Sequence, residues 1–162
     1  MWWSRRGVIL AACAALPACG FRPLYSEGSA AVALQGSFEF EDEGGPFAFA
    51  MREQLRTRLG VGTAPRYRLT VVTNVDVEER AIRADRSILR FNLQGQADFA
   101  VRSRTSDRVL FQDRATSFTA YSAIASPFAT RAAEDDARRR LAVALADQIV
   151  LRLSATAQDW AA

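Results

Sequence analysis

The stretch LRFNLQGQADFAVR, residues 89–102, decides the fold of this chain. Apolar and polar side chains alternate along it, which predicts a β-strand with one buried face and one face in water. Gly95 stands in the middle of this strand and indicates either a bulge or a close approach of the backbone to another element. The predicted buried face consists of Leu89, Phe91, Leu93, Ala97, Phe99 and Val101.

Strands of the same kind flank this one. Residues 67–78 alternate in the same way and predict a half-buried strand, followed by a polar connection at residues 79–86. After a tight turn, Val109 and Phe111 restart the alternation. Asp113 would then point into the core, so we expect a bulge or a change of phase before Phe118 and Tyr121.

Two amphipathic helices are predicted outside these three strands. Pro46 suits the first helical position, and apolar side chains recur every four residues from Phe47 to Leu59, before Gly60 ends the helix. A longer helix opens at Ser126-Pro127, with an apolar stripe of Ala133, Ala137, Leu141, Leu145, Ile149 and Leu153. Residues 32–40 alternate loosely and predict a first strand ahead of both helices.

The order β-α-β-β-β-α predicts an α+β fold. We expect a two-layer sandwich in which two helices pack on one face of a four-stranded, mostly antiparallel sheet, while the other sheet face stays polar. The side chains expected between the two layers are Phe91, Phe99, Leu141 and Leu145. Residues 31–155 are expected to form this single domain, and residues 156–162 a C-terminal tail.

The N-terminus has the anatomy of a bacterial lipoprotein leader. Arg5 and Arg6 provide a positive start, an apolar stretch follows, and Leu16-Pro17-Ala18-Cys19 has the pattern of a lipobox. We therefore predict that residues 1–18 are removed, that Cys19 is lipidated and anchors the chain to a membrane, and that residues 19–30 form a tether. The alternative is an ordinary secretory signal with a plain thiol at Cys19. The paired arginines leave open whether export uses the twin-arginine or the general secretory route.

Composition excludes several kinds of catalytic site. The chain has no His, which excludes Ser-His and Cys-His catalysis and His-ligated metals. Cys13 leaves with the leader and Cys19 carries lipid, so the mature chain keeps no free thiol and no disulfide. We predict no catalytic residue, no metal site, no cofactor and no nucleic-acid partner. A hydrolase built on carboxylates is the alternative, but the acidic runs 41–43 and 135–136 are better explained as charges at the start of helices.

The residues that follow the lipobox resemble a known family. Cys19-Gly20-Phe21-Arg22-Pro23-Leu24-Tyr25 is similar to the start of the LptE-family lipopolysaccharide-assembly lipoproteins, in the form found in alphaproteobacteria. The predicted order of elements fits that family's fold. So does the segment 122–130, which leads into a long terminal helix rich in Arg and Ala.

This resemblance implies a non-catalytic subunit of the machine that assembles lipopolysaccharide. Such a protein is anchored by lipid in the inner leaflet of the outer membrane, at its periplasmic face. It plugs the β-barrel of its partner LptD and helps lipopolysaccharide to reach the outer leaflet. The alternative is a stand-alone periplasmic lipoprotein that binds a lipid or a solute.

A local excess of arginine marks the candidate ligand site. Once Arg5 and Arg6 have left with the leader, 19 of the 21 basic residues remain, all of them Arg, against 18 acidic residues. The mature chain is therefore nearly neutral. Residues 80–114 nevertheless hold eight Arg and only four acidic residues. Arg binds phosphates and carboxylates bidentately. We predict that lipopolysaccharide is contacted by Arg90, Arg102, Arg104 and Arg108. The alternative is a solvated hairpin whose charges protect a sheet edge. The run Arg138–Arg140 is interpreted as the wet face of a helix that follows acids four residues earlier.

Overall fold

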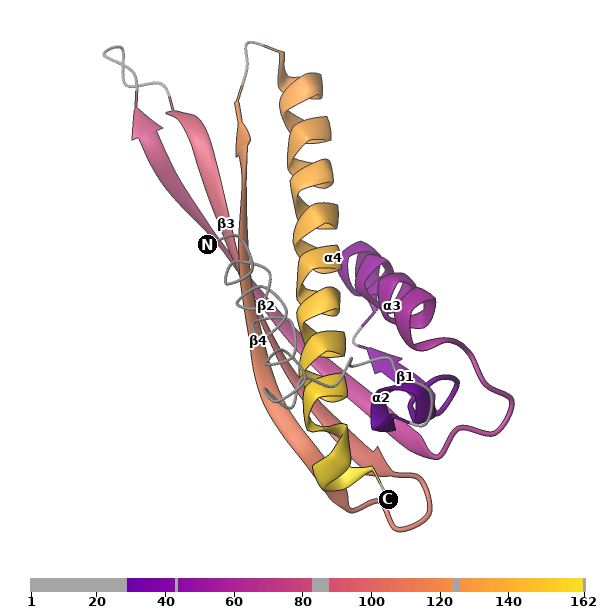
Figure 1. Ribbon diagram of the computed structural model, residues 1–162. Coiled ribbons are helices and arrows are strands. Elements are labelled where there is room, and N and C mark those ends of the chain that lie inside the picture. The colour runs from indigo at the N-terminus through magenta and orange to yellow at the C-terminus, as the bar shows by residue number, and fades with distance from the viewer. Residues whose placement is uncertain (1–28, 43, 83–87, 124–125, 162) are drawn as a thin grey trace, which may run out of the picture.

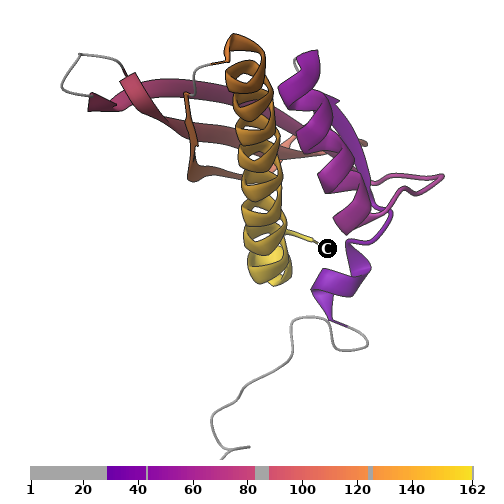
Figure 2. The ribbon, with the colours of Figure 1, turned by 90° about the horizontal axis from the view of Figure 1, so that it is seen from above.

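The computed structural model describes residues 29–42, 44–82, 88–123 and 126–161, so the predicted leader and nearly all of the predicted tether lie outside the described residues. Its helices and strands are α2 (Ala30–Ala33), β1 (Phe38–Asp42), α3 (Gly45–Leu59), β2 (Tyr67–Ile82), β3 (Ile88–Ser103), β4 (Val109–Ser122) and α4 (Pro127–Trp160). The strands form one sheet in the order β1-β2-β3-β4. Both α3 and α4 lie on the same face of this sheet (Figures 1 and 2).

The predicted α+β class is confirmed, with a sheet that is mostly antiparallel. β2 pairs with β3, and β3 with β4, in antiparallel fashion, whereas the short β1 runs parallel to β2. A parallel neighbour requires a crossover connection, and α3 supplies it. The β2 strand is longer than predicted, because it continues through residues 79–82 with an irregular register against β3.

The predicted first strand is wrong in its N-terminal half. Val32 belongs to the short helix α2, whose N-cap Ser29 accepts a hydrogen bond from the Val32 N–H at 3.3 Å. Gly36 then turns the chain with a φ of +67°, and the strand begins at Phe38. A helical cap and a run of alanines therefore outweigh a loose alternation of apolar side chains.

The core lies between the sheet and the helices. Leu141 and Leu145 of α4 are fully buried and Phe99 of β3 is buried, as predicted. Phe91 is only half-buried and lies outside the main core, so the prediction that it lies in the core between the two layers is wrong. It stacks on Tyr121 with ring centroids 5.0 Å apart. The reason is that α3 covers only the lower part of the sheet, so this upper end has α4 alone beside it (Figure 1).

Gly95 allows α4 to approach the sheet closely. The register runs through it without a bulge, from Val75 on β2 to Ser117 on β4. A Cβ added at Gly95 would lie 2.9 Å from Leu141 Cδ2 and 3.1 Å from Leu145 Cδ1. Of the two explanations predicted for this glycine, the structure therefore supports close approach.

The expected change of phase near Asp113 is wrong. Asp113 pairs with the core residue Phe99, and the ladder of β4 with β3 continues without interruption from Phe111 to Ser122. The register shift lies earlier, between the pairs Val101–Phe111 and Arg102–Val109. Asp113 thus faces the helix layer, where Arg152 of α4 neutralises it at 2.7 Å.

The terminal helix continues past Leu153, the last residue of its predicted apolar stripe, and includes most of the expected tail. Residues 156–160 continue α4, and Trp160 is 8% exposed. Its ring packs against Phe38, Tyr67 and Phe111 at centroid distances of 6.3, 5.4 and 6.0 Å. An aromatic side chain near the C-terminus therefore closes the lower end of the core.

Candidate functional site

Three of the four predicted ligand arginines lie together at the lower end of the sheet. Arg102 is the last residue but one of β3, and Arg104 and Arg108 flank the turn to β4. The register places Arg68 of β2 directly beside Arg102, on the polar sheet face that points away from the helices. We call Arg68, Arg102, Arg104 and Arg108 the hairpin cluster.

Acidic side chains already hold much of the hairpin cluster. Arg104 Nε lies 3.1 Å from Glu39 Oε2, and Arg68 Nε lies 3.4 Å from Glu41 Oε1. Arg102 donates a hydrogen bond to the Asp107 backbone carbonyl at 3.1 Å. Because these side chains are a third or more exposed, each ion pair is weak and an incoming anion can compete for the arginines. Among the described residues, Arg108 has no ion-pair partner and is the arginine most available to a ligand.

Arg90 does not belong to this site. It lies at the opposite end of β3, where it is exposed and pairs with Ser122. Twelve strand residues separate it from Arg102, which corresponds to about 40 Å. One ligand head group cannot bridge that distance, so the structure divides the predicted arginine set.

Arg68 was not singled out from the sequence. It sits in a strand 34 residues before Arg102, and only the pairing of β2 with β3 brings the two together. The alternation of residues 67–78 does put Arg68 on the polar face, but the alternation carries no information about which residue lies opposite. The missing signal is the strand register.

The rest of the polar sheet face is broad and has few charges near its centre, while Asp76 and Glu78 lie farther along β2. Asp98 and Arg114 form a close ion pair at 2.6 Å near its centre, and the hydrogen bond from Arg114 lowers the pKa of Asp98. Around this pair lie small or neutral side chains, among them Thr70, Asn74, Gln94, Ala100, Gln112 and Thr116. Phe118 of β4 stands out on this face with 83% of its surface exposed. This face is suited to contact with another polar surface.

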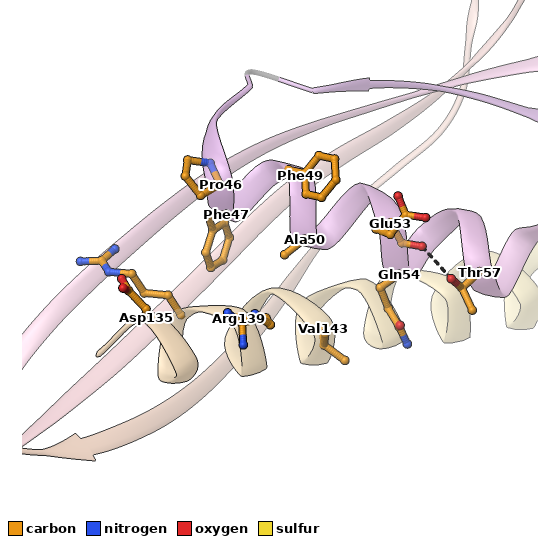
Figure 3. Close-up of a pocket in the computed structure, with 11 residues that line it drawn as sticks. Pro46, Phe47, Phe49, Ala50, Glu53, Gln54, Thr57, Asp135, Arg139 and Val143 are labelled. Atoms are coloured by element: carbon orange, nitrogen blue, oxygen red, sulfur yellow. Dashed lines mark hydrogen bonds between the residues drawn. The ribbon is translucent and has the colours of Figure 1, made fainter. Parts of the chain in front are cut away.

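On the helix side, α3 and α4 enclose a groove of about 680 Å³ (Figure 3). Phe47, Phe49 and Ala50 of α3 and Val143 of α4 supply its apolar lining. Polar side chains stand at its margins, including Glu53, Gln54 and Thr57 on α3 and Asp135, Arg138 and Arg139 on α4. Near one end, Asp147 of α4 accepts hydrogen bonds from Gln54 at 2.8 Å and from Arg58 at 3.0 Å and holds the helices together. None of the four predicted ligand arginines lines this groove.

The run Arg138–Arg140 has largely the structural role expected of it. Arg138 pairs with Glu134, and Arg140 pairs with Asp136, each four residues earlier. Arg140 also reaches across to β4, where it donates to the Thr119 hydroxyl at 2.9 Å. In the part of the chain that the structure describes, no group of three His, Cys, Asp or Glu side chains is arranged to hold a metal ion. Within the same residues, no helix is long and apolar enough to cross a membrane.

Solved structures place this architecture among domains of bacterial lipoproteins. A candidate lipoprotein from Caulobacter crescentus CB15 has 25% sequence identity and a TM-score of 0.66, over 78% of this chain and 94% of that one. The rare lipoprotein B from Shewanella oneidensis has 12% identity and a TM-score of 0.58, over 74% and 94% of the two chains. A minor lipoprotein from Acinetobacter baumannii has 18% identity and a TM-score of 0.58, over 75% and 92%. The last two comparisons bear on the fold alone.

A comparison of the sequence with family models identifies the family of this chain. Residues 36–153 match the LptE family, described as lipopolysaccharide-assembly, and this chain belongs to that family. The match spans β1 to most of α4 and therefore includes the hairpin cluster, the polar sheet face and the groove. No curated protein sequence matches the chain.

Proposed function

We propose that this protein is the non-catalytic lipoprotein subunit of the outer-membrane lipopolysaccharide translocon. In this proposal Cys19 carries the lipid anchor and holds the domain at the periplasmic face of the outer membrane. The domain plugs the β-barrel partner LptD and assists the insertion of lipopolysaccharide into the outer leaflet. The observation that carries the proposal is membership of the LptE family over residues 36–153.

The polar sheet face supports a position inside a barrel. The interior of a large membrane β-barrel is polar, whereas its outer surface is apolar. A plug therefore needs a broad surface that is hydrophilic yet carries little net charge. The outer face of β2, β3 and β4 has this character, because its central charges, Asp98 and Arg114, are paired with each other.

The hairpin cluster supports a role for the protein beyond plugging. Lipopolysaccharide carries phosphates and acidic sugars, and Arg forms charge-assisted, bidentate hydrogen bonds with such groups. Arg102, Arg104 and Arg108 belong to the β3–β4 hairpin, whose turn lies at one end of the elongated domain (Figure 1). We assign the lipopolysaccharide contact to these three and to Arg68, and no longer to Arg90.

Isolation of the protein from outer membranes in mild detergent tests this function. We expect an affinity-tagged chain to retain a large β-barrel protein in near-equal amount through gel filtration. A chain with Phe118→Arg and Thr116→Arg on the exposed sheet face is expected to lose the barrel while keeping its circular-dichroism spectrum. Isolation of wild-type protein that carries only lipid or a small solute would instead favour the stand-alone binding lipoprotein.

A further inference from the structure

We propose that the groove between α3 and α4 is the binding site for the protein's own tether, with residues 20–26 lying along it. These residues include Phe21, Leu24 and Tyr25, three large apolar side chains in the short segment between the lipidation site and the folded domain. A tether that served only as a spacer would need none of them, because linkers are typically small and polar. The inference rests on the lipid anchor at Cys19 that the proposed function includes, but not on the barrel partner or on lipopolysaccharide binding.

The groove offers the matching apolar surface. Phe49 is 56% exposed at its rim, and Phe47, Ala50 and Val143 are only half-buried in its lining. In Figure 3 Phe47 and Ala50 extend from α3 towards α4, whereas the ring of Phe49 stands on the side of α3 away from α4. Exposed aromatic side chains next to further apolar surface are typical of a binding site.

The segment that follows the tether is attached to α3 at one end of the groove. The described chain starts at Ser29, and the α2 segment is fixed to the end of α3 by two hydrogen bonds: Gln35 Nε2 donates to the Arg58 carbonyl at 2.9 Å, and the Gly36 N–H donates to the Leu59 carbonyl at 2.7 Å. Thr57, at that end of the groove, is adjacent to Arg58. The tether therefore starts within one short helix of the groove.

The tether also has sufficient length. The groove follows α3 from Thr57 back to Pro46, which is about 17 Å at the rise of an α-helix. The ten residues 19–28 reach at most about 35 Å when extended. About 18 Å of extended tether therefore remains for the path from Ser29 past α2 to the groove, and a fully extended tether would bring Cys19 towards the Pro46 end.

Both partners carry charges of both signs, because Arg138 and Arg139 line the groove beside its two acids. Glu53 on α3 and Asp135 on α4 line the groove, and the carboxylates of both lack an ion-pair partner among the described residues. Arg22 lies between the two aromatic residues of the tether and can supply a cation to either carboxylate. Glu27, nearer the domain, offers a complementary carboxylate to the basic end of α3, where Arg56 and Arg58 lie.

Docking of the tether has a structural consequence for the anchored protein. A free tether lets the domain move about 35 Å from the membrane in any direction. A docked tether holds the lipid close to the N-terminal end of α3, so that the helix layer faces the membrane and the polar sheet face is turned away from it. The tether then acts as an orienting device rather than as a spacer.

Disulfide trapping tests this proposal in the mature lipoprotein, reconstituted in phosphatidylcholine vesicles. After intact mass has shown that Cys19 carries lipid, the only thiols are those introduced. Leu24→Cys is combined either with Thr57→Cys, at the groove, or with Arg56→Cys, at the same height on another side of α3. We expect the intramolecular disulfide to form at least tenfold faster with Thr57→Cys. Phe49→Ser, added to the fast pair, is expected to slow trapping at least threefold without changing the circular-dichroism spectrum.

Three results would overturn the proposal. Equal trapping rates at Thr57 and Arg56 would mean that the tether is free. Disulfides formed mainly between chains would mean that the groove takes the tether of a second copy. A phospholipid retained in native mass spectrometry of the wild type, and released by Phe49→Ser without any change in trapping, would assign the groove to lipid.

Discussion

Asp113 of β4 and Arg152 of α4 form an ion pair across the boundary between sheet and helix, with 2.7 Å between Asp113 Oδ2 and Arg152 Nη1. The backbone N–H of Arg114 donates to Asp113 Oδ1 at 2.7 Å. The backbone hydrogen bond, followed by the one from Arg152, lowers the pKa of Asp113. A carboxylate that the sequence pattern directs into the core is thus held there by a partner from the C-terminal half of α4.

We predict that Asp113→Asn destabilises the fold modestly and in a pH-dependent way. The two side chains are 35% and 42% exposed, so solvent screens the pair and its loss costs roughly 0.2–1 kcal/mol at pH 7. Because the folded-state pKa is depressed, this stabilisation is present above the unfolded value, about 3.9, and is lost as pH falls through the folded pKa. Urea titrations at pH 7 and pH 2.5 measure it.

The difference in unfolding free energy between the wild type and Asp113→Asn should therefore be smaller at pH 2.5 than at pH 7. Arg152→Gln serves as the matched control, because it removes the same pair while leaving the backbone hydrogen bond to Asp113 in place. A difference between wild type and Asp113→Asn that persists unchanged at pH 2.5 would contradict the electrostatic account.

We predict that Gly95→Ala destabilises the protein although alanine suits a strand better than glycine. The new Cβ would lie 2.9 Å from Leu141 Cδ2 and 3.1 Å from Leu145 Cδ1, so α4 must shift or repack. Overpacking of this kind costs about 1–3 kcal/mol. Urea denaturation measures the change in unfolding free energy.

A double-mutant cycle isolates the contact behind this effect. Leu141→Ala alone creates a cavity, but in the presence of Gly95→Ala it also makes room for the new methyl group. We expect the double variant to be more stable than the sum of the two single changes implies. Strict additivity would show that Gly95 matters through strand propensity and not through its contact with α4.

We predict that Phe99→Ala is much more destabilising than Phe91→Ala. Phe99 is 3% exposed in the main core, so its truncation should cost about 3–5 kcal/mol. Phe91 is half-buried and stacks on Tyr121, so we expect less than half of that loss. Thermal and urea unfolding compare the two variants directly, and equal losses would contradict the assignment of Phe91 to the periphery.

The contrast between these two phenylalanines shows what a sequence can and cannot predict here. Alternation along residues 89–102 correctly places both rings on the helix-facing side of β3, because the side-chain period of a strand is a local property. Whether a helix covers that side depends on where α3 begins its crossover, which is a tertiary property. The same limit explains why Arg68 was not grouped with Arg102, and why the inward Asp113 could not be matched with Arg152, 39 residues further along the chain.

The anchor is predicted from the leader alone, and a single substitution tests it. Cys19→Ala should block lipidation, so the chain should be released from the membrane or retained as an unprocessed precursor. Stable anchoring requires at least two acyl chains, each buried CH₂ of which contributes about 0.8 kcal/mol. Intact mass of the membrane-bound wild type should show a chain that begins at Cys19 with lipid attached, and a different, lipid-free N-terminus would refute the prediction.

The last prediction concerns the hairpin cluster and follows from the division of the arginines. Arg102→Glu with Arg108→Glu should weaken binding of purified lipopolysaccharide at least tenfold. Each Arg–phosphate contact is worth about 1.5–3 kcal/mol, and about 1.4 kcal/mol corresponds to a factor of ten. Arg90→Glu is the matched control, since it reverses one charge on the same strand and the same sheet face at the far end. Arg138→Glu with Arg139→Glu controls for charge reversal on α4.

Fluorescence titrations with lipopolysaccharide, at fixed ionic strength, distinguish the possible results. Loss of affinity only in the Arg102 and Arg108 variant would locate the anion site at the hairpin cluster, provided that its circular-dichroism spectrum and barrel association are unchanged. Similar losses in all three variants would indicate attraction by net charge without a defined site. Unchanged affinity in the Arg102 and Arg108 variant would mean that these two side chains serve only to keep the hairpin solvated, with Asp107 as the partner of Arg102.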